Sequence, residues 1–443
     1  MSKSAALHAG SDPYVPRHGD PNVEVLHYDL TLAYKVEGNR LDGDAILTCR
    51  VLAETDGLHL DLHGLHPQKV FLDGRAHRFT HLRGRLSVKR PLTAGTELTV
   101  RVKYSGKPRP ISTRTLGSAG WEELEDGVIV AAQPHGAPTW FPCNDRPDNK
   151  ATYTLRFSAP PDYTVAVSGE LQGTSRKGNA VTWSYEQAVP MPTYLATVQI
   201  GRYRRLEHAG GPVPVRTIAP PTFSAEDLES SFGAQTAMLT FFAGLFGDYP
   251  FASYTAVITE DELEIPRESQ GLSTFGSNFV DTDWESMRLI AHELSHQWFG
   301  NSVTLQRWQD IWLHEGFACY CEWLWAEESG ISTVQAEVEK HHELLAGLPQ
   351  DDLQLADPGP ELMFDDRVYK RGALAVHALR LHCGDERFFA LVSGWLTQHR
   401  AGNVSTEMFL EHVGREAGEE AVALLSPWLF ETELPSCPGP ASD

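Results

Sequence analysis

The sequence predicts a two-domain protein in which a large antiparallel β domain is followed by a mixed α+β domain that is mostly helical. The first domain is indicated by short runs of alternating apolar and polar residues, separated by Gly and Pro, between residues 21 and 205. The second is indicated by apolar residues at helical spacing throughout 206–443. The length of 443 residues is also more than one domain usually holds. Residues 1–20 precede both domains as a polar N-terminal tail.

The alternation begins at Tyr28, where Tyr28, Leu30 and Leu32 share one face of the expected strand. The sequence Glu-Gly-Asn at 37–39 then supplies a turn. The same alternation recurs further along the chain, at 58–62, 98–104, 153–157 and 163–167. Many short strands joined by turns are typical of a large antiparallel β domain.

The helical pattern begins after a boundary rich in Gly and Pro, at 210–212 and 220–221. Ser224 is expected to cap the first helix, because Asp227 stands three residues later in the capping-box position. Strand-like segments occupy 249–279, which makes this domain mixed rather than purely helical. We expect helices at 225–245, 287–300, 309–328, 333–348 and 368–383, with several more up to residue 431.

The composition excludes several classes of function. A formal net charge of −22 argues against a nucleic-acid partner, since binding phosphates requires a basic surface. No segment approaches the roughly 18 consecutive apolar residues of a membrane span. The N-terminus has no basic region followed by an apolar one, so we expect a cytoplasmic protein. The six cysteines show no disulfide framework, and we take a monomer as the default.

The chemistry concentrates in His292-Glu293-Leu294-Ser295-His296. With 19 His in 443 residues, about 0.8 His-x-x-x-His pairs arise by chance, and requiring Glu after the first His lowers this to about 0.06. On a helix, side chains four residues apart lie one above the other, so His292 and His296 can bind one ion. A hydrogen-bonded core position is the usual role of a lone His, but the combined motif makes a zinc site the better interpretation.

Glu315 is the candidate third ligand, on the next expected helix, with eighteen residues between it and His296. Three protein ligands leave one position of a zinc ion open, which marks a catalytic rather than a structural site. Glu293 would face the water at that position and act as general base. The sequence therefore predicts one catalytic Zn²⁺, held by His292, His296 and Glu315.

These residues resemble the aminopeptidase N family of zinc metallopeptidases, which belong to the gluzincins. The resemblance is carried by the runs HELSHQWFGN at 292–301 and WQDIWLHEGFA at 308–318, and more weakly by WFPCND at 140–145 and YKRGA at 369–373. It extends over roughly residues 21–435. It implies a short two-domain member, with the antiparallel β domain followed by a thermolysin-like, mostly helical catalytic domain.

The resemblance also implies roles for residues outside the metal site. Tyr369 matches the tyrosine whose hydroxyl stabilises the oxyanion, a role that suits a fixed hydrogen-bond donor. Glu268 matches the glutamate that binds the substrate's α-ammonium, and Gln133 matches a second amine-binding position. His314 replaces the asparagine that is usual before the third ligand, and we do not count it as a ligand.

The amine-binding loop departs from the family pattern. Where the family has Gly-x-Met-Glu-Asn, this sequence reads Pro266-Arg267-Glu268-Ser269 after Ile265, so only the glutamate remains. A carboxylate still suits an ammonium group. Two nearby acidic residues, Glu262 and Glu264, could serve instead, which leaves the specificity for the first substrate residue open.

The implied activity is that of a zinc-dependent aminopeptidase acting on peptides with a free N-terminus. A zinc endopeptidase, or another zinc hydrolase with the same site, is the alternative that the altered loop supports. A non-catalytic peptide-binding protein is a further alternative, against which the full set of ligands and Glu293 argues. The sequence ends soon after the catalytic domain, so we expect a more open site that accepts peptides of varied length.

Overall fold

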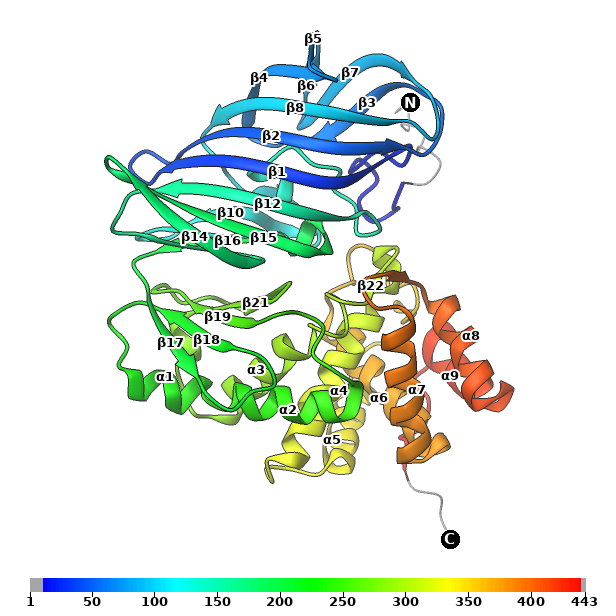
Figure 1. Ribbon diagram of the computed structural model, residues 1–443. Coiled ribbons are helices and arrows are strands. Elements are labelled where there is room, and N and C mark those ends of the chain that lie inside the picture. Colours follow the sequence, from blue (N-terminus) through cyan, green and yellow to red (C-terminus); the bar gives the residue numbers. More distant parts are fainter. Residues whose placement is uncertain (1–10, 440–443) are drawn as a thin grey trace.

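The computed structural model describes residues 11–439, so the first ten residues of the expected tail and residues 440–443 lie outside it. Its N-terminal part is built from β-sheets and its C-terminal part is mostly helical (Figure 1). Among the described residues, no helix combines the length and the apolar character needed to cross a bilayer.

Three sheets make up the β domain. The eight-stranded sheet has the order β14 (Glu170–Lys177), β15 (Ala180–Pro192), β12 (Lys150–Ala159), β1 (Val23–Lys35), β2 (Arg40–Val51), β8 (Glu97–Gly106), β4 (Leu65–Leu72) and β5 (Arg75–His77). A five-stranded sheet contains β13 (Thr164–Val167), β16 (Val198–Gly201), β11 (Val128–Ala131), β10 (Gly117–Glu123) and β9 (Ile111–Thr113). A three-stranded sheet contains β3 (Thr55–Asp61), β7 (Arg85–Leu92) and β6 (Thr80–Leu82).

The expected alternation is present in β1, where Tyr28, Leu30 and Leu32 are buried. The turn that follows is the one the sequence predicts, with positive φ angles at Gly38 and Asn39. The expectation of an antiparallel domain is wrong for one pair, because β1 and β12 run parallel with Tyr28 beside Tyr153. These strands are separated by more than a hundred residues, so local sequence patterns could not reveal their relative direction.

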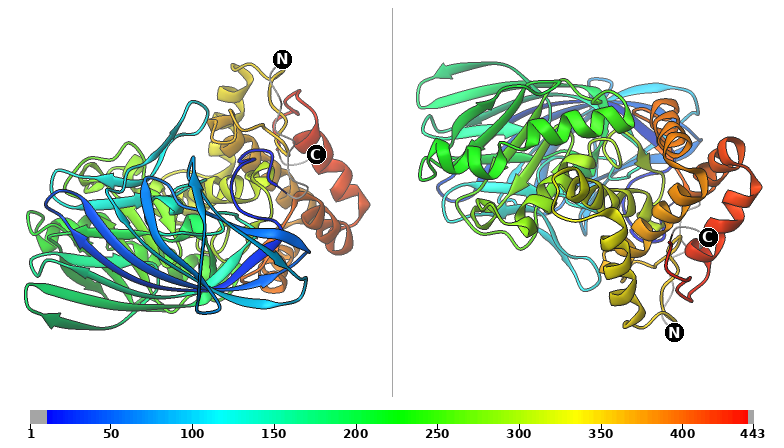
Figure 2. Two further views of the ribbon diagram at one scale, coloured as in Figure 1. Left: turned by 90° about the horizontal axis from the view of Figure 1, so that it is seen from above. Right: turned by 90° about the horizontal axis from the view of Figure 1, so that it is seen from below.

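The C-terminal domain begins with a mixed five-stranded sheet in the order β17 (Arg204–His208), β18 (Val215–Ala219), β19 (Tyr254–Ile258), β21 (Leu272–Phe275) and β20 (Arg267–Ser269). β18, β19 and β21 are parallel to one another, and β20 runs antiparallel to β21 at the edge of the sheet. In Figure 1 this sheet lies between the β domain and helices α1 and α2, and Figure 2 shows those helices from below.

The helices of this domain are α1 (Ala225–Phe232), α2 (Gln235–Phe246), α3 (Trp284–Ser295), α4 (Trp312–Glu328), α5 (Val334–Ala346), α6 (Asp366–Cys383), α7 (Asp385–Gln398), α8 (Thr406–Ala417) and α9 (Glu419–Phe430). The capping box at Ser224 and Asp227 is confirmed, since both of its hydrogen bonds are present. The single helix expected over 225–245 is wrong: α1 ends at Phe232 and α2 starts at Gln235, with Gly233 between them. Glycine has a low helix propensity, so a glycine at this position favours a break between two helices.

Residues 11–20, which we call the N-terminal strap, bind both domains. On the catalytic side, the Trp308 backbone N–H donates to Asp12 Oδ2 at 2.8 Å. On the β side, the Gly19 backbone N–H donates to Asp61 Oδ2 at 2.6 Å. The strap therefore holds the two domains together through backbone hydrogen bonds that are buried from solvent.

Candidate active site

Helices α3 and α4 position the three candidate metal ligands. Asp283 caps α3, and its side chain accepts a hydrogen bond from the Ser286 N–H at 2.7 Å. A negative charge at this end also stabilises the helix through its favourable interaction with the helix dipole. His292 lies in the last turn of α3, and His296 follows as its C-cap with helical backbone angles. Glu315 lies in the first turn of α4, which packs against α3.

The three ligand atoms converge on one point. The Nε2 atoms of His292 and His296 are 3.1 Å apart, and Glu315 Oε2 lies 3.4 Å from each. Ligand atoms at Zn–N and Zn–O distances near 2.0–2.1 Å in a tetrahedral site are about 3.3 Å from one another. All three side chains are buried, so the arrangement fits a zinc ion bound by these residues.

Each imidazole is oriented by a hydrogen bond on its other nitrogen. His292 Nδ1 is 2.8 Å from Glu322 Oε1, and His296 Nδ1 is 2.9 Å from the Phe299 carbonyl oxygen. Because an oxygen acceptor faces Nδ1 of each ring, the ring proton lies on Nδ1. The lone pair of each Nε2 is then free to bind a metal. The sequence interpretation missed Glu322, although its spacing of seven residues from Glu315 places both on one face of α4.

The electrostatics of this cluster favour a cation. Burial by itself would lower the pKa of His296, but the charges of Glu268 and Glu315 outweigh it and raise the pKa to about 10. For Glu315 the balance is the reverse: burial by itself would raise its pKa, but the adjacent His296 and His292 hold that pKa far below its usual range. Several carboxylates around two imidazoles create a strongly negative environment, which a divalent metal ion neutralises.

Glu293 lies beside the ligands with one oxygen unused. Its Oε2 atom is buried and has no hydrogen-bond partner among residues 11–439. Burial and the neighbouring Glu268 charge raise the pKa of Glu293 to about 7. A carboxylate with an unpaired oxygen and such a pKa can accept a proton from water and release it again near neutral pH.

Tyr369 reaches the site from α6. Its ring stacks on that of His292, with the ring centroids 6.0 Å apart. Burial and the negative charge of Glu315 raise the pKa of Tyr369 well above its ordinary value, so its hydroxyl keeps its proton and can act as a donor.

The close approach of α4 and α6 depends on two glycines that follow the site residues. A Cβ atom added at Gly316 would lie 2.8 Å from Gly372 Cα, and one added at Gly372 would lie 2.7 Å from Gly316 Cα. The helices therefore cross backbone against backbone. This crossing brings Tyr369 of α6 and Glu315 of α4 to the same site, and it gives a physical reason for the glycine in each motif.

Gln133 and Glu268 meet across the domain boundary. Gln133 follows β11 in the β domain, and its Nε2 donates to Glu268 Oε1 on β20 at 2.7 Å. Burial raises the pKa of Glu268, and the positive charge of His296 opposes that rise. The two other carboxylates considered from the sequence, Glu262 and Glu264, are exposed. The structure thus brings Glu268, and not those two, together with Gln133.

Strand β20 is fixed to the metal-binding segment by amide side chains that the sequence interpretation missed. The Ser269 carbonyl oxygen accepts from Gln297 Nε2 at 3.1 Å and from Asn301 Nδ2 at 3.0 Å. Gln297 Oε1 also accepts from the Gly271 N–H at 2.8 Å. Since Gln297 directly follows His296, these bonds set the position of Glu268 relative to the ligands.

His314 is buried beside the ligands but does not join them. His314 directly precedes Glu315 in α4, and its Nε2 accepts a hydrogen bond from the Leu305 backbone N–H at 2.9 Å. Burial lowers the pKa of His314 to about 3, so the ring is neutral. The side chain supports the start of α4 and contributes no atom to the group of ligands.

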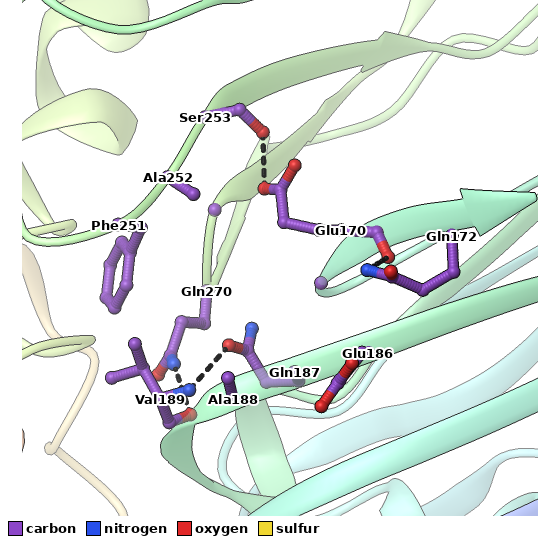
Figure 3. Close-up of a pocket in the computed structure, with 12 residues that line it drawn as sticks. Glu170, Gln172, Glu186, Gln187, Ala188, Val189, Phe251, Ala252, Ser253 and Gln270 are labelled. Atoms are coloured by element: carbon purple, nitrogen blue, oxygen red, sulfur yellow. Dashed lines mark hydrogen bonds between the residues drawn. The ribbon is translucent and has the colours of Figure 1, made fainter.

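A separate cavity of about 220 Å³ lies at the junction of the domains (Figure 3). It is lined by residues of β14 and β15 and by the segments around Ser253 and Gln270, and Glu170 Oε1 accepts from Ser253 Oγ at 2.6 Å. None of the predicted site residues lines this cavity.

Comparison with known proteins gives matches over most of the chain. Residues 231–428 match the Peptidase family M1 domain, and residues 24–195 match the Peptidase M1 N-terminal domain. Aminopeptidase 2 of Candida albicans is 25% identical over 445 residues, a match that covers 94% of this chain and 48% of that protein. Leucyl aminopeptidase of Saccharolobus solfataricus is 22% identical over 93% of this chain and 54% of its own length.

Solved structures match nearly the whole chain. The crystal structure of the M1 zinc metallopeptidase from Deinococcus radiodurans is 31% identical, with a TM-score of 0.88, over 97% of this chain and 99% of that one. This chain therefore spans about half the length of the curated relatives it matches but the full length of the two-domain enzyme.

Proposed function

The chain belongs to the peptidase M1 family, and from that premise we propose that it is a zinc-dependent aminopeptidase that removes N-terminal residues from peptides. One observation carries the proposal: the Glu268 carboxylate, hydrogen-bonded to Gln133, is held beside a complete set of zinc ligands. A carboxylate at that place suits a free α-ammonium group. Two-domain relatives have been solved with L-arginine, with L-tryptophan and with a Tyr-Ser-Ala substrate.

The proposed mechanism divides the work among these residues. A zinc ion held by His292, His296 and Glu315 supplies positive charge that acidifies water and polarises a carbonyl group. Glu268 and Gln133 bind the ammonium group and thereby place the first peptide bond at the site.

The remaining steps are proton transfer and charge stabilisation. Glu293 takes a proton from the attacking water and later passes it to the departing amine. The Tyr369 hydroxyl donates a hydrogen bond to the oxygen on which negative charge develops. Both roles are supported by the pKa values of these groups, which leave Glu293 able to exchange a proton and Tyr369 protonated near neutral pH.

The test is hydrolysis of a panel of aminoacyl-anilides and their N-acetylated twins by the zinc-replete protein. We expect cleavage of the free-amine substrates alone. Glu293→Gln should keep its zinc, measured by metal analysis, and lose turnover by a factor on the order of 10³ or more. Near-normal turnover in this variant would contradict the role of Glu293.

The alternative, a zinc endopeptidase, is favoured by the altered sequence around Glu268. Internally quenched peptides with blocked N-termini distinguish it, because an endopeptidase cleaves them and an aminopeptidase does not. Cleavage of blocked peptides at internal bonds would replace the proposal with this alternative.

A further inference from the structure

Arg288 and the ligand His292 share one buried carboxylate. The two residues lie four positions apart on α3, so their side chains leave the same face of the helix one turn apart. Glu322 of α4 contacts both of them. Its Oε1 is 2.8 Å from His292 Nδ1, and its Oε2 accepts a hydrogen bond from Arg288 Nη1 at 3.0 Å. Two side chains of one helix thus engage the two oxygens of one carboxylate on the facing helix.

The Glu322 carboxylate depends on these contacts because it is removed from water. Its side chain is 4% exposed, whereas that of Arg288 is 28% exposed. A buried carboxylate is costly unless it is paired and hydrogen-bonded. Lys370 of α6 also carries charge near Glu322, but its Nζ donates to Cys319 Sγ at 3.4 Å and lies 3.8 Å from Asp366 Oδ1. Among residues 11–439, Arg288 is the one Arg or Lys side chain that forms an ion pair with Glu322.

Holding the second oxygen fixes the orientation of the carboxylate. The last torsion of a glutamate side chain is broad, so a carboxylate that is bound at one oxygen can turn about the bond to its own chain. With Arg288 on Oε2 and His292 on Oε1, the plane of the Glu322 carboxylate is set from both sides. The His292 ring is fixed in turn, since its Nδ1 donates to an acceptor that cannot turn away.

We propose that Arg288 is a positioning residue of the metal centre: it holds Glu322 Oε2 and thereby keeps Glu322 Oε1 on Nδ1 of the zinc ligand His292. The inference rests on the zinc-dependent function proposed above, and it adds to that function a residue outside the group of ligands. It also specifies a route, because the whole effect of Arg288 on zinc passes through Glu322.

The direction of the change in zinc affinity separates this role from simple charge repulsion. A positive charge near the site repels Zn²⁺, so the loss of the Arg288 charge would by itself tighten zinc binding. The loss of its hold on Glu322 has the opposite effect, because groups that support a ligand typically change metal affinity by about 10- to 100-fold. For Arg288→Met we expect zinc binding to weaken by roughly 10-fold. Arg288→Lys keeps the charge without the planar fork and should recover part of that loss.

The measurement is competition for zinc between the metal-free protein and a chromophoric chelator at one fixed pH. Glu285→Gln is the matched control. Glu285 accepts from Arg288 Nε at 2.7 Å, but the pair is exposed to water, and such pairs contribute little. This variant should bind zinc as the wild type does. Circular dichroism of each metal-free variant verifies that it is folded.

A double-mutant cycle tests the route through Glu322. Arg288→Met should weaken zinc binding in the wild-type background and have no further effect in the Glu322→Gln background. An equal loss in both backgrounds would show that Arg288 acts independently of Glu322 and would overturn the inference. If Arg288→Met does not fold, the same cycle with Arg288→Lys decides the question.

Hydrolysis of free-amine anilides separates this inference from the proposed function. If the wild type cleaves them and Arg288→Met binds zinc at least as tightly as the wild type, the inference is wrong and the aminopeptidase function stands. If the wild type cleaves none of them but the zinc affinities follow the expected cycle, the proposed function fails and the positioning role of Arg288 stands.

Discussion

Gln133 of the β domain and Glu268 of the catalytic domain are joined by a hydrogen bond of 2.7 Å, so the proposed amine-binding site is shared between the domains. The bond orients a carboxylate that is largely removed from water, where a hydrogen bond to a charged group is worth about 1.5–3 kcal/mol. In the proposed function the β domain therefore contributes a residue to the active site and is not only a support for it.

Replacing Gln133 should therefore weaken the binding of free-amine substrates. For Gln133→Ala we expect kcat/KM on a leucyl-anilide to fall by roughly 10- to 100-fold, mainly through KM, because the ammonium loses an oriented partner. Steady-state kinetics measure this directly. Gln172→Ala, which removes an exposed glutamine of β14, is the matched control and should behave as the wild type. An unchanged KM in Gln133→Ala would contradict the assignment.

Glu322 is expected to set the zinc affinity. Its carboxylate holds His292 Nδ1 at 2.8 Å, and such supporting groups typically change metal affinity by about 10- to 100-fold. Glu322→Gln should lose zinc to a competing chelator at correspondingly lower chelator concentrations. Glu285→Gln is the matched control, since Glu285 also pairs with Arg288 but does not contact a ligand. Equal zinc retention in the two variants would show that Glu322 has no such role.

The helix crossing at Gly316 and Gly372 predicts an effect on turnover without a loss of zinc ligands. Gly372→Ala places a methyl group 2.7 Å from Gly316 Cα, so α6 must move away from α4 and carry Tyr369 with it. We expect kcat to fall by at least about 100-fold, since small displacements of catalytic groups are costly.

The control for that variant is Gly244→Ala in α2, where an added Cβ meets no atom within 4 Å. This change should leave activity intact and stabilise the fold by about 0.5–1 kcal/mol, because alanine favours the helix. Thermal unfolding and anilide hydrolysis of both variants separate the two effects. Full activity in Gly372→Ala would mean that the crossing does not position Tyr369.

Lys150 predicts a pH dependence of stability. This lysine on β12 donates to the Ser302 carbonyl oxygen at 2.8 Å, across the domain boundary, and burial lowers its pKa to about 7. The unfolded chain binds a proton at Lys150 up to a pKa of about 10.4, so the folded state is penalised at lower pH. The contribution of Lys150 to stability is full above that unfolded pKa and is lost as the pH falls through 7.

Between pH 7 and pH 9 the free energy of unfolding of the wild type should therefore rise, by about 2 kcal/mol, relative to that of Lys150→Gln. Urea denaturation of the two proteins at several pH values measures the difference. If the free energies of unfolding of the two proteins changed equally with pH, the pKa of Lys150 would not differ between the folded and unfolded states, and the prediction would be wrong. Lys177→Gln, on exposed β14, serves as a control that should follow the wild type at every pH.

The sequence predicted those parts of the site that depend on local spacing. His292 and His296 are four residues apart in the sequence, and the structure brings their ligand atoms together with that of Glu315 in a group that could hold a zinc ion. The two-domain order of a β domain and a mostly helical domain is confirmed as well. Helical periodicity and motif spacing are sufficient for such features.

What the sequence could not predict depends on contacts between distant segments. The parallel pairing of β1 with β12 and the orientation of His292 by Glu322 arise only when the chain is folded. The same holds for Gln297, an ordinary polar residue in the sequence, which makes two hydrogen bonds to the backbone of Ser269 and Gly271, and for Asn301, which makes a third to Ser269. Among these residues Glu322 alone has a local signal, its spacing of seven residues from Glu315 on one face of α4.

The N-terminal strap has a thermodynamic consequence for the whole molecule. Tyr14 adds to its catalytic-side contacts by donating to Asp357 Oδ1 at 2.6 Å, while Asp20 adds to the β side by donating its N–H to Asn144 Oδ1 at 2.6 Å. Neither domain can lose its structure without releasing a segment that also stabilises the other. We therefore expect a single cooperative transition in calorimetric melting, because the strap acts together with the hydrogen bonds of Gln133 to Glu268 and of Lys150 to Ser302 across the domain boundary.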